Sequence, residues 1–236
     1  MDFSQRSYQP EFLDRKDIPF VDIARNMKEL NFINTHLGGH NITIHGLKKI
    51  LSHATEKKNN LLVCEIGCGG GDNLQVIYDW CTKNNIRVNT LGIDINPDCI
   101  EYARTHTSIP VSNWIASDYK TVNLSEKPDI IFNSLFCHHF NDEQMIHILK
   151  WMKKYATVGF FINDLHRHAL AFYSIKLLTK LFSKSYLVKN DAPLSVQRGF
   201  TRKEIEQFIR EAGIQAFNIE WKWAFRWLIT ATNETT

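Results

Sequence analysis

Residues 61–74 combine residue types that can bind a nucleotide. An apolar run is followed by the acidic Glu65, and glycines then occupy positions 67, 69, 70 and 71 ahead of a segment with helical character. Glycine allows positive φ angles and a close approach of backbone to a ligand. A strand that leads into such a turn and then a helix is how α/β folds bind nucleotides. This segment therefore predicts a nucleotide site.

The spacing of the glycines excludes two common nucleotide sites. A dinucleotide fingerprint needs G-x-G-x-x-G, but counting from Gly67 places Asp72 at the last position, and counting from Gly69 places Leu74 there. A phosphate-binding P-loop needs a Gly-Lys pair after the turn, and no lysine lies near the glycines. The pattern that remains is Glu65-x-Gly67-x-Gly69-x-Gly71.

This pattern resembles the first motif of the class I S-adenosylmethionine (SAM)-dependent methyltransferases, whose order of elements the chain follows from about residue 58. The resemblance implies SAM as the methyl donor, S-adenosylhomocysteine (SAH) as the product, and Glu65, Gly67, Gly69 and Gly71 as cofactor-binding residues. The methionine part of SAM carries an ammonium and a sulfonium, so its site needs acidic side chains rather than a lysine, which Glu65 satisfies.

Other side chains at predicted strand ends extend the cofactor site. Asp94 ends the second predicted strand, where a carboxylate accepts hydrogen bonds from ribose hydroxyls in related folds. The resemblance implies that Asp118, after the third strand, accepts a hydrogen bond from the adenine amino group. Ile95 and Tyr119 are expected to form apolar walls for the adenine ring. Asn133, in the fourth strand, completes the predicted set of cofactor contacts.

Two relatives with the same fold fit the sequence less well. The G-G-G-D turn at residues 69–72 also resembles aminopropyltransferases, but these need an acidic residue at the fourth strand, which ends here in Asn133-Ser134-Leu135. The Asn/Asp-Pro-Pro-Tyr hallmark of base N-methyltransferases is absent as well. Nucleic acid is therefore a less favoured substrate than a small molecule.

Histidines after the fourth and fifth predicted strands are the candidate catalytic residues. Methyl transfer requires an aligned nucleophile and, for an oxygen nucleophile, removal of a proton. His138 and His139 could supply a base, because histidine titrates near neutral pH. The alternative is that they orient the loop or cap the next helix. His166 is a third candidate, with a polar strand-to-helix turn as its alternative, and Cys137 is expected to be a packed thiol.

The hydrophobic pattern predicts alternating strands and helices. Period-two or fully apolar runs indicate strands, and apolar residues every three or four positions indicate helices. The predicted strands span 61–66, 87–94, 110–116, 129–135, 158–163, 215–220 and 222–232, and the predicted helices span 18–37, 41–55, 73–84, 96–105, 141–152, 168–182 and 201–212.

This alternation indicates a mostly parallel sheet with helices on both faces. The resemblance implies a Rossmann-like three-layer αβα sandwich, with a seven-stranded sheet that ends in an antiparallel pair. Residues 1–58 are expected to form an N-terminal helical cap and substrate lid. Residues 59–236 are expected to form the methyltransferase domain, with a lid insertion at about 166–200.

Apolar side chains in the expected lid segments predict an apolar acceptor pocket. They are Leu170, Tyr173, Leu177, Leu178, Leu181 and Phe182 in the insertion and Phe12, Phe20 and Phe32 near the start. We expect O-methylation of a phenolic or polyketide-type metabolite of secondary metabolism, with C-methylation of a quinone type or a non-catalytic cofactor- or partner-binding module as alternatives. Lysines border the helix at 168–182, but core packing is favoured there over contact with a membrane surface.

Bulk composition sets the remaining expectations. A chain of 236 residues with 44% hydrophobic residues and a net charge of +3 predicts an ordinary globular protein. The five cysteines include no C-x-x-C pair, so reduced thiols and no metal site are expected. We find no apolar run of about 20 residues and no signal pattern at the N-terminus, which predicts a cytoplasmic location. The oligomeric state stays open.

Overall fold

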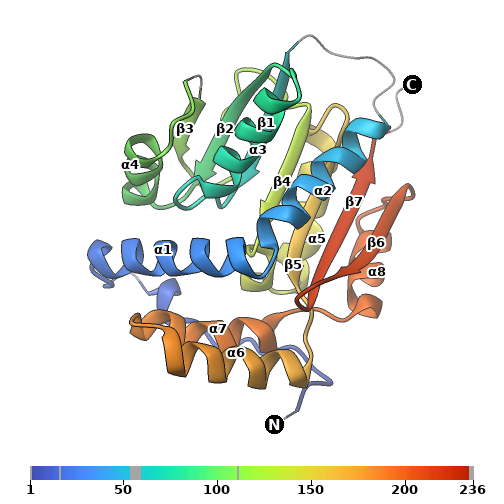
Figure 1. Ribbon diagram of the computed structural model, residues 1–236. Coiled ribbons are helices and arrows are strands. Elements are labelled where there is room, and N and C mark those ends of the chain that lie inside the picture. Colours follow the sequence, from blue (N-terminus) through green and yellow to red (C-terminus); the bar gives the residue numbers. More distant parts are fainter. Residues whose placement is uncertain (1, 16, 54–59, 111, 234–236) are drawn as a thin grey trace.

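A seven-stranded sheet forms the centre of the computed structural model, which describes residues 2–15, 17–53, 60–110 and 112–233 (Figure 1). Its strand order is β3-β2-β1-β4-β5-β7-β6. Neighbouring strands pair in parallel except around β7, which is antiparallel to both β5 and β6. The predicted fold class is confirmed. The strands are β1 (Leu61–Ile66), β2 (Val88–Asp94), β3 (Ser112–Ala116), β4 (Ile130–Ser134), β5 (Gly159–Leu165), β6 (Phe217–Lys222) and β7 (Arg226–Thr232).

Helices cover both faces of the sheet and also extend below it in Figure 1. One face packs against α2 (Gly39–Ser52), α3 (Asp72–Lys83) and α4 (Pro97–His106), and the other against α5 (Asp142–Tyr155) and α8 (Arg202–Glu211). The helices α1 (Phe20–His36), α6 (Ala169–Phe182) and α7 (Tyr186–Arg198) lie at the carboxyl edge of the parallel strands. Short 3-10 helices, η1 (Phe12–Asp14) and η2 (Cys137–His139), lie at the same edge.

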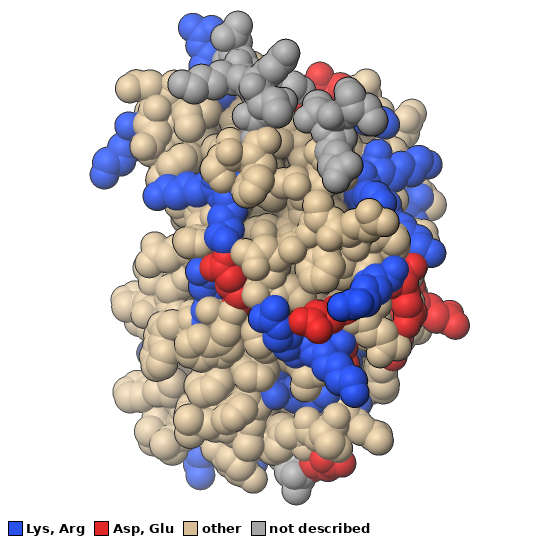
Figure 2. Space-filling view, turned by 90° about the vertical axis from the view of Figure 1, so that its right-hand side faces the viewer, with Lys and Arg blue, Asp and Glu red and all other residues tan. Residues whose placement is uncertain are grey.

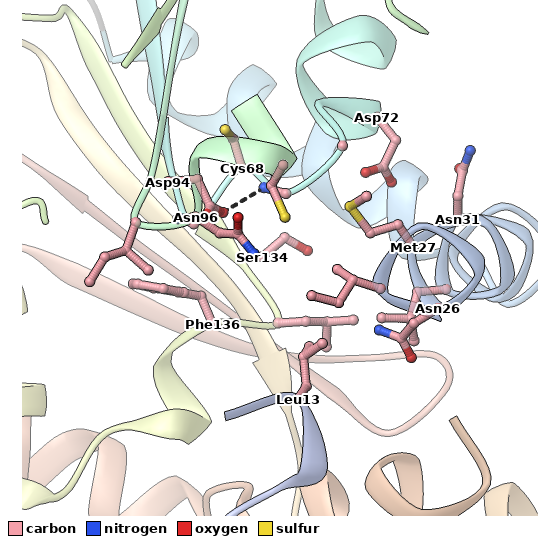
Figure 3. A pocket seen from close by; sticks show the side chains of 18 of the residues that line it. Leu13, Asn26, Met27, Asn31, Cys68, Asp72, Asp94, Asn96, Ser134 and Phe136 are labelled. Carbon is pink, nitrogen blue, oxygen red and sulfur yellow. Dashed lines mark hydrogen bonds between the residues drawn. The ribbon is translucent and has the colours of Figure 1, made fainter. Parts of the chain in front are cut away.

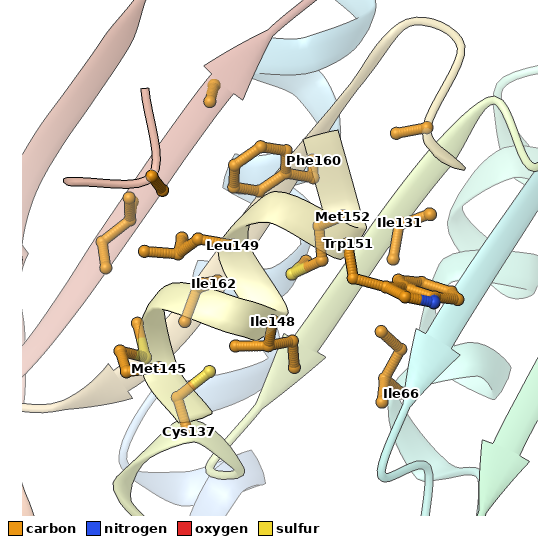
Figure 4. Packing of buried hydrophobic residues seen from close by; sticks show 14 of the residues in the cluster. Ile66, Ile131, Cys137, Met145, Ile148, Leu149, Trp151, Met152, Phe160 and Ile162 are labelled. Atoms are coloured by element: carbon orange, nitrogen blue, oxygen red, sulfur yellow. The ribbon is translucent and has the colours of Figure 1, made fainter. Parts of the chain in front are cut away.

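The central strands are buried on both sides because each face of the sheet has its own apolar core. All six residues of β1 are buried, with Leu62, Cys64 and Ile66 on one face and Leu61 and Val63 on the other. Figure 4 shows the first face, where the apolar side chains of α5 pack against β4 and β5. Full burial of such a side chain contributes about 1.5–3 kcal/mol. This packing fixes the strand ends that build the site.

The described residues before β1 lie in two parts of the molecule, and the predicted domain boundary at residue 58 stays a prediction. Helix α2 packs on β5 closely enough that a Cβ added at Gly46 would lie 2.6 Å from the Phe161 ring. It therefore belongs to the sandwich, whereas residues 2–36 lie with α6 and α7 at the edge of the sheet (Figure 1). Helix α2 ends at Ser52, and residues 54–55 of the helix predicted over 41–55 lie outside the described residues.

The sequence pattern did not predict α7, which contains Pro193 in its interior and begins at the side-chain cap of Ser185. Among the described residues, no helix is long and apolar enough to cross a membrane.

Candidate active site

The glycine turn after β1 adopts backbone conformations that residues with a side chain rarely adopt. Gly67, Gly69 and Gly71 all have positive φ angles, of 69°, 49° and 77°. A Cβ added at Gly67 would lie 2.2 Å from the Phe136 ring, and one at Gly71 would lie 2.5 Å from the Trp114 ring. Gly71 is also the N-cap residue of α3. The turn therefore needs glycine for both its conformation and its packing.

A cavity of about 720 Å³ opens beside this turn. Figure 3 shows its walls: the glycine turn and Asp94 on the sheet side, Asn26, Met27 and Asn31 of α1 opposite, and Leu13 of the N-terminal segment. We call it the large cavity. Of the predicted cofactor contacts, Glu65, Gly67, Gly69, Asp94 and Ile95 line it. The contribution of α1 and of the N-terminal segment was not predicted from the sequence.

Negative charge is concentrated in the large cavity. Its walls carry five carboxyl groups, on Asp14, Glu65, Asp72, Asp94 and Asp98, while its one arginine, Arg15, pairs with Asp17. Glu65 is buried, and its Oε1 accepts a hydrogen bond from Asn73 at 3.0 Å, but its Oε2 has no hydrogen-bond partner among the described residues. Burial, reinforced by the charges of Asp72 and Asp94, raises the pKa of Glu65 well above its usual value. The cavity therefore favours a cationic ligand.

Asp94 is held at the end of β2 by the backbone. Its Oδ2 accepts from the Gly69 N–H and its Oδ1 from the Asn96 N–H, both at 2.9 Å. Burial raises the pKa of Asp94, and these N–H donors oppose that rise. Each carboxylate oxygen has a second acceptor position. Asp94 can therefore still accept two hydrogen bonds from a ligand, such as those of a ribose diol.

Four predicted cofactor residues do not line the large cavity. Gly71 shapes the turn, and Asn133 is fully buried on β4, where it bonds to the Cys137 thiol. Tyr119 packs in the core against Phe140 and Trp151 because its ring faces away from the sheet edge. The Asp118 carboxylate accepts from the Lys120 N–H in the same turn. Roles for these residues at the cofactor stay predictions.

A second cavity of about 130 Å³, the small cavity, shares Leu13, Asn26, Leu30, Leu135 and His139 with the large one. The large and small cavities are thus adjacent, and a reacting group bound in one can face a group bound in the other. Leu135, at the shared wall, has a φ of 53°, a strained conformation for a residue with a side chain. The strain lies where the chain turns from β4 into η2.

His138 lines the small cavity and is oriented by a buried carboxylate. Its Nδ1 lies 2.8 Å from Asp164 Oδ1, so Nδ1 carries the proton and Nε2 keeps its lone pair when the ring is neutral. Nε2 lies 3.7 Å from Glu11 Oε1, beyond hydrogen-bond range. Burial alone would raise the pKa of Asp164, but its contacts with His138 outweigh burial and lower it. His138 is thus positioned to accept a proton at Nε2.

His139 lines both cavities, and the N-terminal segment holds it. Its Nδ1 lies 3.0 Å from Asp14 Oδ1, and its Nε2 lies 3.9 Å from Glu11 Oε2. Burial raises the pKa of Glu11, whose Oε1 accepts from the Ser195 hydroxyl. For Asp14, the contacts with His139 overcome burial and lower the pKa.

The N-terminal segment is fixed over the site by buried arginines, which the sequence analysis did not single out. Arg198 donates to the backbone oxygens of Gln9, His138 and His139 and to the Asp14 carboxylate. Arg6 donates to the backbone oxygens of Phe140 and Arg198. In the sequence, the polar residues before α1 are the only sign that this segment covers the site. Asp164 itself lay in a segment noted for His166.

Glu11, His138 and His139 could in principle hold a cation, because their donor atoms lie within 4.8 Å of one another. Arg198 Nε, however, lies 3.9 Å from Glu11 Oε1, so this carboxylate already has a cationic neighbour. The arrangement fits proton transfer better than metal binding. The expectation of no metal stays a prediction.

His166 is not brought to this site. It lines neither cavity, and its ring lies near Trp227 and His168 instead, because its backbone is tied to Phe225 and Phe200 beyond the end of β5. Its neighbour Arg167 is occupied by the Glu204 carboxylate and the Gly199 oxygen. Strand β5 instead contributes Leu165 to the wall of the small cavity and Asp164 as the partner of His138, and a catalytic role for His166 stays a prediction.

The expected apolar lid residues also lie elsewhere. The leucines and aromatic residues predicted to line an acceptor pocket from α6 are exposed, and Ile175 is the residue of α6 that lines the small cavity. Phe32 is exposed as well, and Phe20 contacts the Tyr102 ring. Apolar walls of the small cavity come instead from Leu30, Ile33, Leu165, Val188 and Val196.

Residues 63–159 match the family described as "Methyltransferase domain". This segment contains the glycine turn, Asp94 and the histidine pair. Together with the strand order, the match shows that the chain has a methyltransferase domain with the fold of the class I enzymes, which confirms the predicted class.

Solved structures extend the likeness over nearly the whole chain. The plantazolicin methyltransferase BpumL, in complex with a pentazolic desmethylPZN analog and SAH, matches with a TM-score of 0.67 and 18% identity over 91% of this chain and 93% of that one. Magnesium protoporphyrin IX methyltransferase from Synechocystis, with bound SAH, gives 0.56 and 14% over 84% of each chain. A SAM-dependent methyltransferase from Aquifex aeolicus gives 0.58 and 15% over 80% and 88%. No curated protein matches the sequence.

Proposed function

We propose that this protein transfers a methyl group from SAM to an oxygen of a small, largely apolar acceptor of phenolic or polyketide type. The observation that carries the proposal is the pairing of two adjacent cavities with different chemistry. The large cavity is rich in carboxylates, and the small cavity has apolar walls with His138 and Arg226 among them.

The residues of the large cavity fit SAM. The unpartnered Glu65 Oε2 and the surrounding carboxylates suit a ligand with an ammonium and a sulfonium. Asp94 would hold the ribose hydroxyls, and Ile95 would lie against the adenine. The matched BpumL and Synechocystis structures contain SAH, which supports the same choice. When bound, SAM supplies an electrophilic methyl group on a positively charged sulfur.

The small cavity supplies the residues for the acceptor. His138 Nε2 would take the proton of the acceptor hydroxyl, and the Asp164 carboxylate would stabilise the resulting imidazolium. Leu135 and His139, which line both cavities, would align the acceptor oxygen with the methyl group and exclude water. The chain thus contributes alignment and proton removal.

Arg226 supports an oxygen-bearing acceptor. Its guanidinium is buried in the wall of the small cavity, where Nη2 donates to Asn34 at 2.8 Å, but Nη1 has no hydrogen-bond partner in the described part of the chain. Burial lowers the pKa of Arg226 to about 10, so it is still protonated at neutral pH. A buried cation without a complete set of acceptors is costly. A carbonyl, carboxylate or phenolate oxygen on the methyl acceptor would provide the missing hydrogen-bond acceptor for Arg226.

A transfer assay with methyl-labelled SAM tests the proposal. The acceptors are matched pairs of phenols, quinols and aromatic acids, each with its methyl-blocked analogue, and NMR of the product identifies the methylated atom. We expect label on oxygen and none with the blocked analogues. Label on ring carbon would replace O-methylation by C-methylation. SAM binding with no label on any acceptor would favour a non-catalytic binding module.

A further inference from the structure

Helix α6 exposes an unusual amount of apolar surface. Leu170, Tyr173, Leu177, Leu178, Leu181 and Phe182 are all exposed, with fractions from 42% for Leu178 to 76% for Phe182. Residues 170, 173, 177 and 181 are spaced three or four apart and so form one stripe along the helix. A different side of α6 is buried, at Ala171, Phe172 and Thr179, and this packing holds the helix in place. The packing of α6 therefore leaves the apolar stripe exposed on the surface.

The segment that carries this stripe has basic but no acidic side chains, and the nearby Glu29 carboxylate of α1 is held by the backbone N–H groups of Lys184 and Ser185. Residues 165–190 contain no aspartate or glutamate, but four lysines, at 176, 180, 184 and 189, are exposed there. Lys176 and Lys180, about one turn apart on α6, lie beside the stripe, and Lys184 follows shortly after the helix ends. None of the four forms a salt bridge within the described part of the chain, although Lys176 lies over the Phe172 ring at 5.6 Å. In Figure 2, basic and acidic side chains lie near one another across the middle of the face, whereas the lower left, at the height of α6 and α7 in Figure 1, is largely uncharged.

From this combination we infer that α6 binds the surface of a membrane that contains anionic lipids. An amphipathic helix lies in the headgroup region when it offers leucine and aromatic side chains to the acyl chains and lysines to anionic headgroups. Lysine suits this role because its stem lies along apolar surface while its ammonium reaches the headgroups. A second protein copy would need a complementary acidic surface beside an apolar one, whereas anionic lipid supplies both features.

The location of α6 connects this surface to the acceptor. Ile175, on the inner side of the helix, lines the small cavity, and α7 contributes Val188 and Val196 to the same walls. The helix pair that would lie on the membrane is therefore also a wall of the acceptor site. If the proposed function holds, the acceptor site shares the wall of α6 with the lipid phase, which suits a lipophilic acceptor. Binding to the membrane does not itself depend on that function.

Vesicle co-sedimentation of the full chain tests the inference. The vesicles are phosphatidylcholine alone or phosphatidylcholine mixed with phosphatidylglycerol. We expect binding to the mixed vesicles, and binding at least about tenfold weaker to phosphatidylcholine alone or in high salt. The double variant Leu177→Glu, Leu181→Glu should weaken binding to the mixed vesicles by on the order of tenfold or more. The triple variant Lys176→Gln, Lys180→Gln, Lys184→Gln should remove the preference for anionic lipid.

Val21→Glu is the matched control, because Val21 is 65% exposed on α1 and lines neither cavity. It should leave vesicle binding unchanged, and circular dichroism with SAM calorimetry shows whether each variant is folded. No binding of the wild-type chain to anionic vesicles would overturn the inference. It would also be overturned if sedimentation velocity showed a wild-type dimer that Leu177→Glu, Leu181→Glu converts to a monomer, since a second copy would then cover the stripe. Neither result bears on SAM binding, so the proposed function is tested separately.

Discussion

The two cavities of the site are built in different ways. The walls of the large cavity come mainly from successive strand-to-helix turns, so Glu65, the glycines and Asp94 lie within 30 residues of one another. The polar groups of the small cavity come from the N-terminal segment, η2, α7 and β7, and Asp164 of β5 lies behind them. Local turns thus define what the protein binds as donor, whereas long-range packing defines the acceptor. Changes in the first region should alter SAM affinity, and changes in the second should alter turnover or acceptor KM.

The largest expected effect is on the acceptor side. His138→Ala should lower kcat by about 10²- to 10⁴-fold, the contribution of a general base, and leave the Kd for SAM unchanged. Asp164→Asn should lower kcat by less, because the imidazole remains but loses its orienting carboxylate. Steady-state kinetics and calorimetry on the same preparations measure both quantities.

His166→Ala is the matched control for His138→Ala, because it removes the same side chain from a position outside both cavities. We expect its kcat to match the wild type. An equal loss of kcat in the two variants would contradict the different roles assigned to His138 and His166, and it would show that His166 contributes to turnover.

Arg226→Gln should mainly raise the acceptor KM. The loss of a charged hydrogen bond to the acceptor oxygen corresponds to about 1.5–3 kcal/mol, or roughly 10- to 150-fold. Acceptors without a second oxygen should show a smaller change, which initial-rate measurements on matched acceptor pairs would detect. A uniform fall in kcat with unchanged KM would indicate that Arg226 supports the fold rather than the acceptor.

The smallest effect concerns pH and the large cavity. Because burial raises the pKa of Glu65, the free protein keeps this carboxyl protonated above the usual range. A cationic ligand favours the carboxylate, so SAM binding should release protons, and its affinity should rise with pH by at most about tenfold per unit for each proton released. Calorimetry in buffers of different ionisation enthalpy measures the release, and Glu65→Gln should reduce it. Proton uptake on binding would contradict this account.

Sequence and structure agree best where short-range rules apply. The glycine spacing, the apolar strands and the helical periodicity predicted the turn, the sheet and the helices α5 and α8, which begin with capping boxes at Asn141 and Thr201. Helix α7 was missed because Pro193 argues against a helix interior, and tertiary packing overrides that preference here. Glu11 and Arg198 could not be found because only the closed chain brings residue 11 to residue 138. The same holds for Asp164, whose role depends on the turn of η2.

Equilibrium binding of SAM to the wild-type chain and to Asp94→Ala tests the central claim most directly. We expect one SAM per chain, and SAH at the same site. In Asp94→Ala, the loss of two hydrogen bonds to a charged acceptor should weaken binding by on the order of 10²-fold or more. No detectable binding of SAM or SAH by the wild-type chain, or an affinity unchanged by Asp94→Ala, would contradict the assignment of the large cavity.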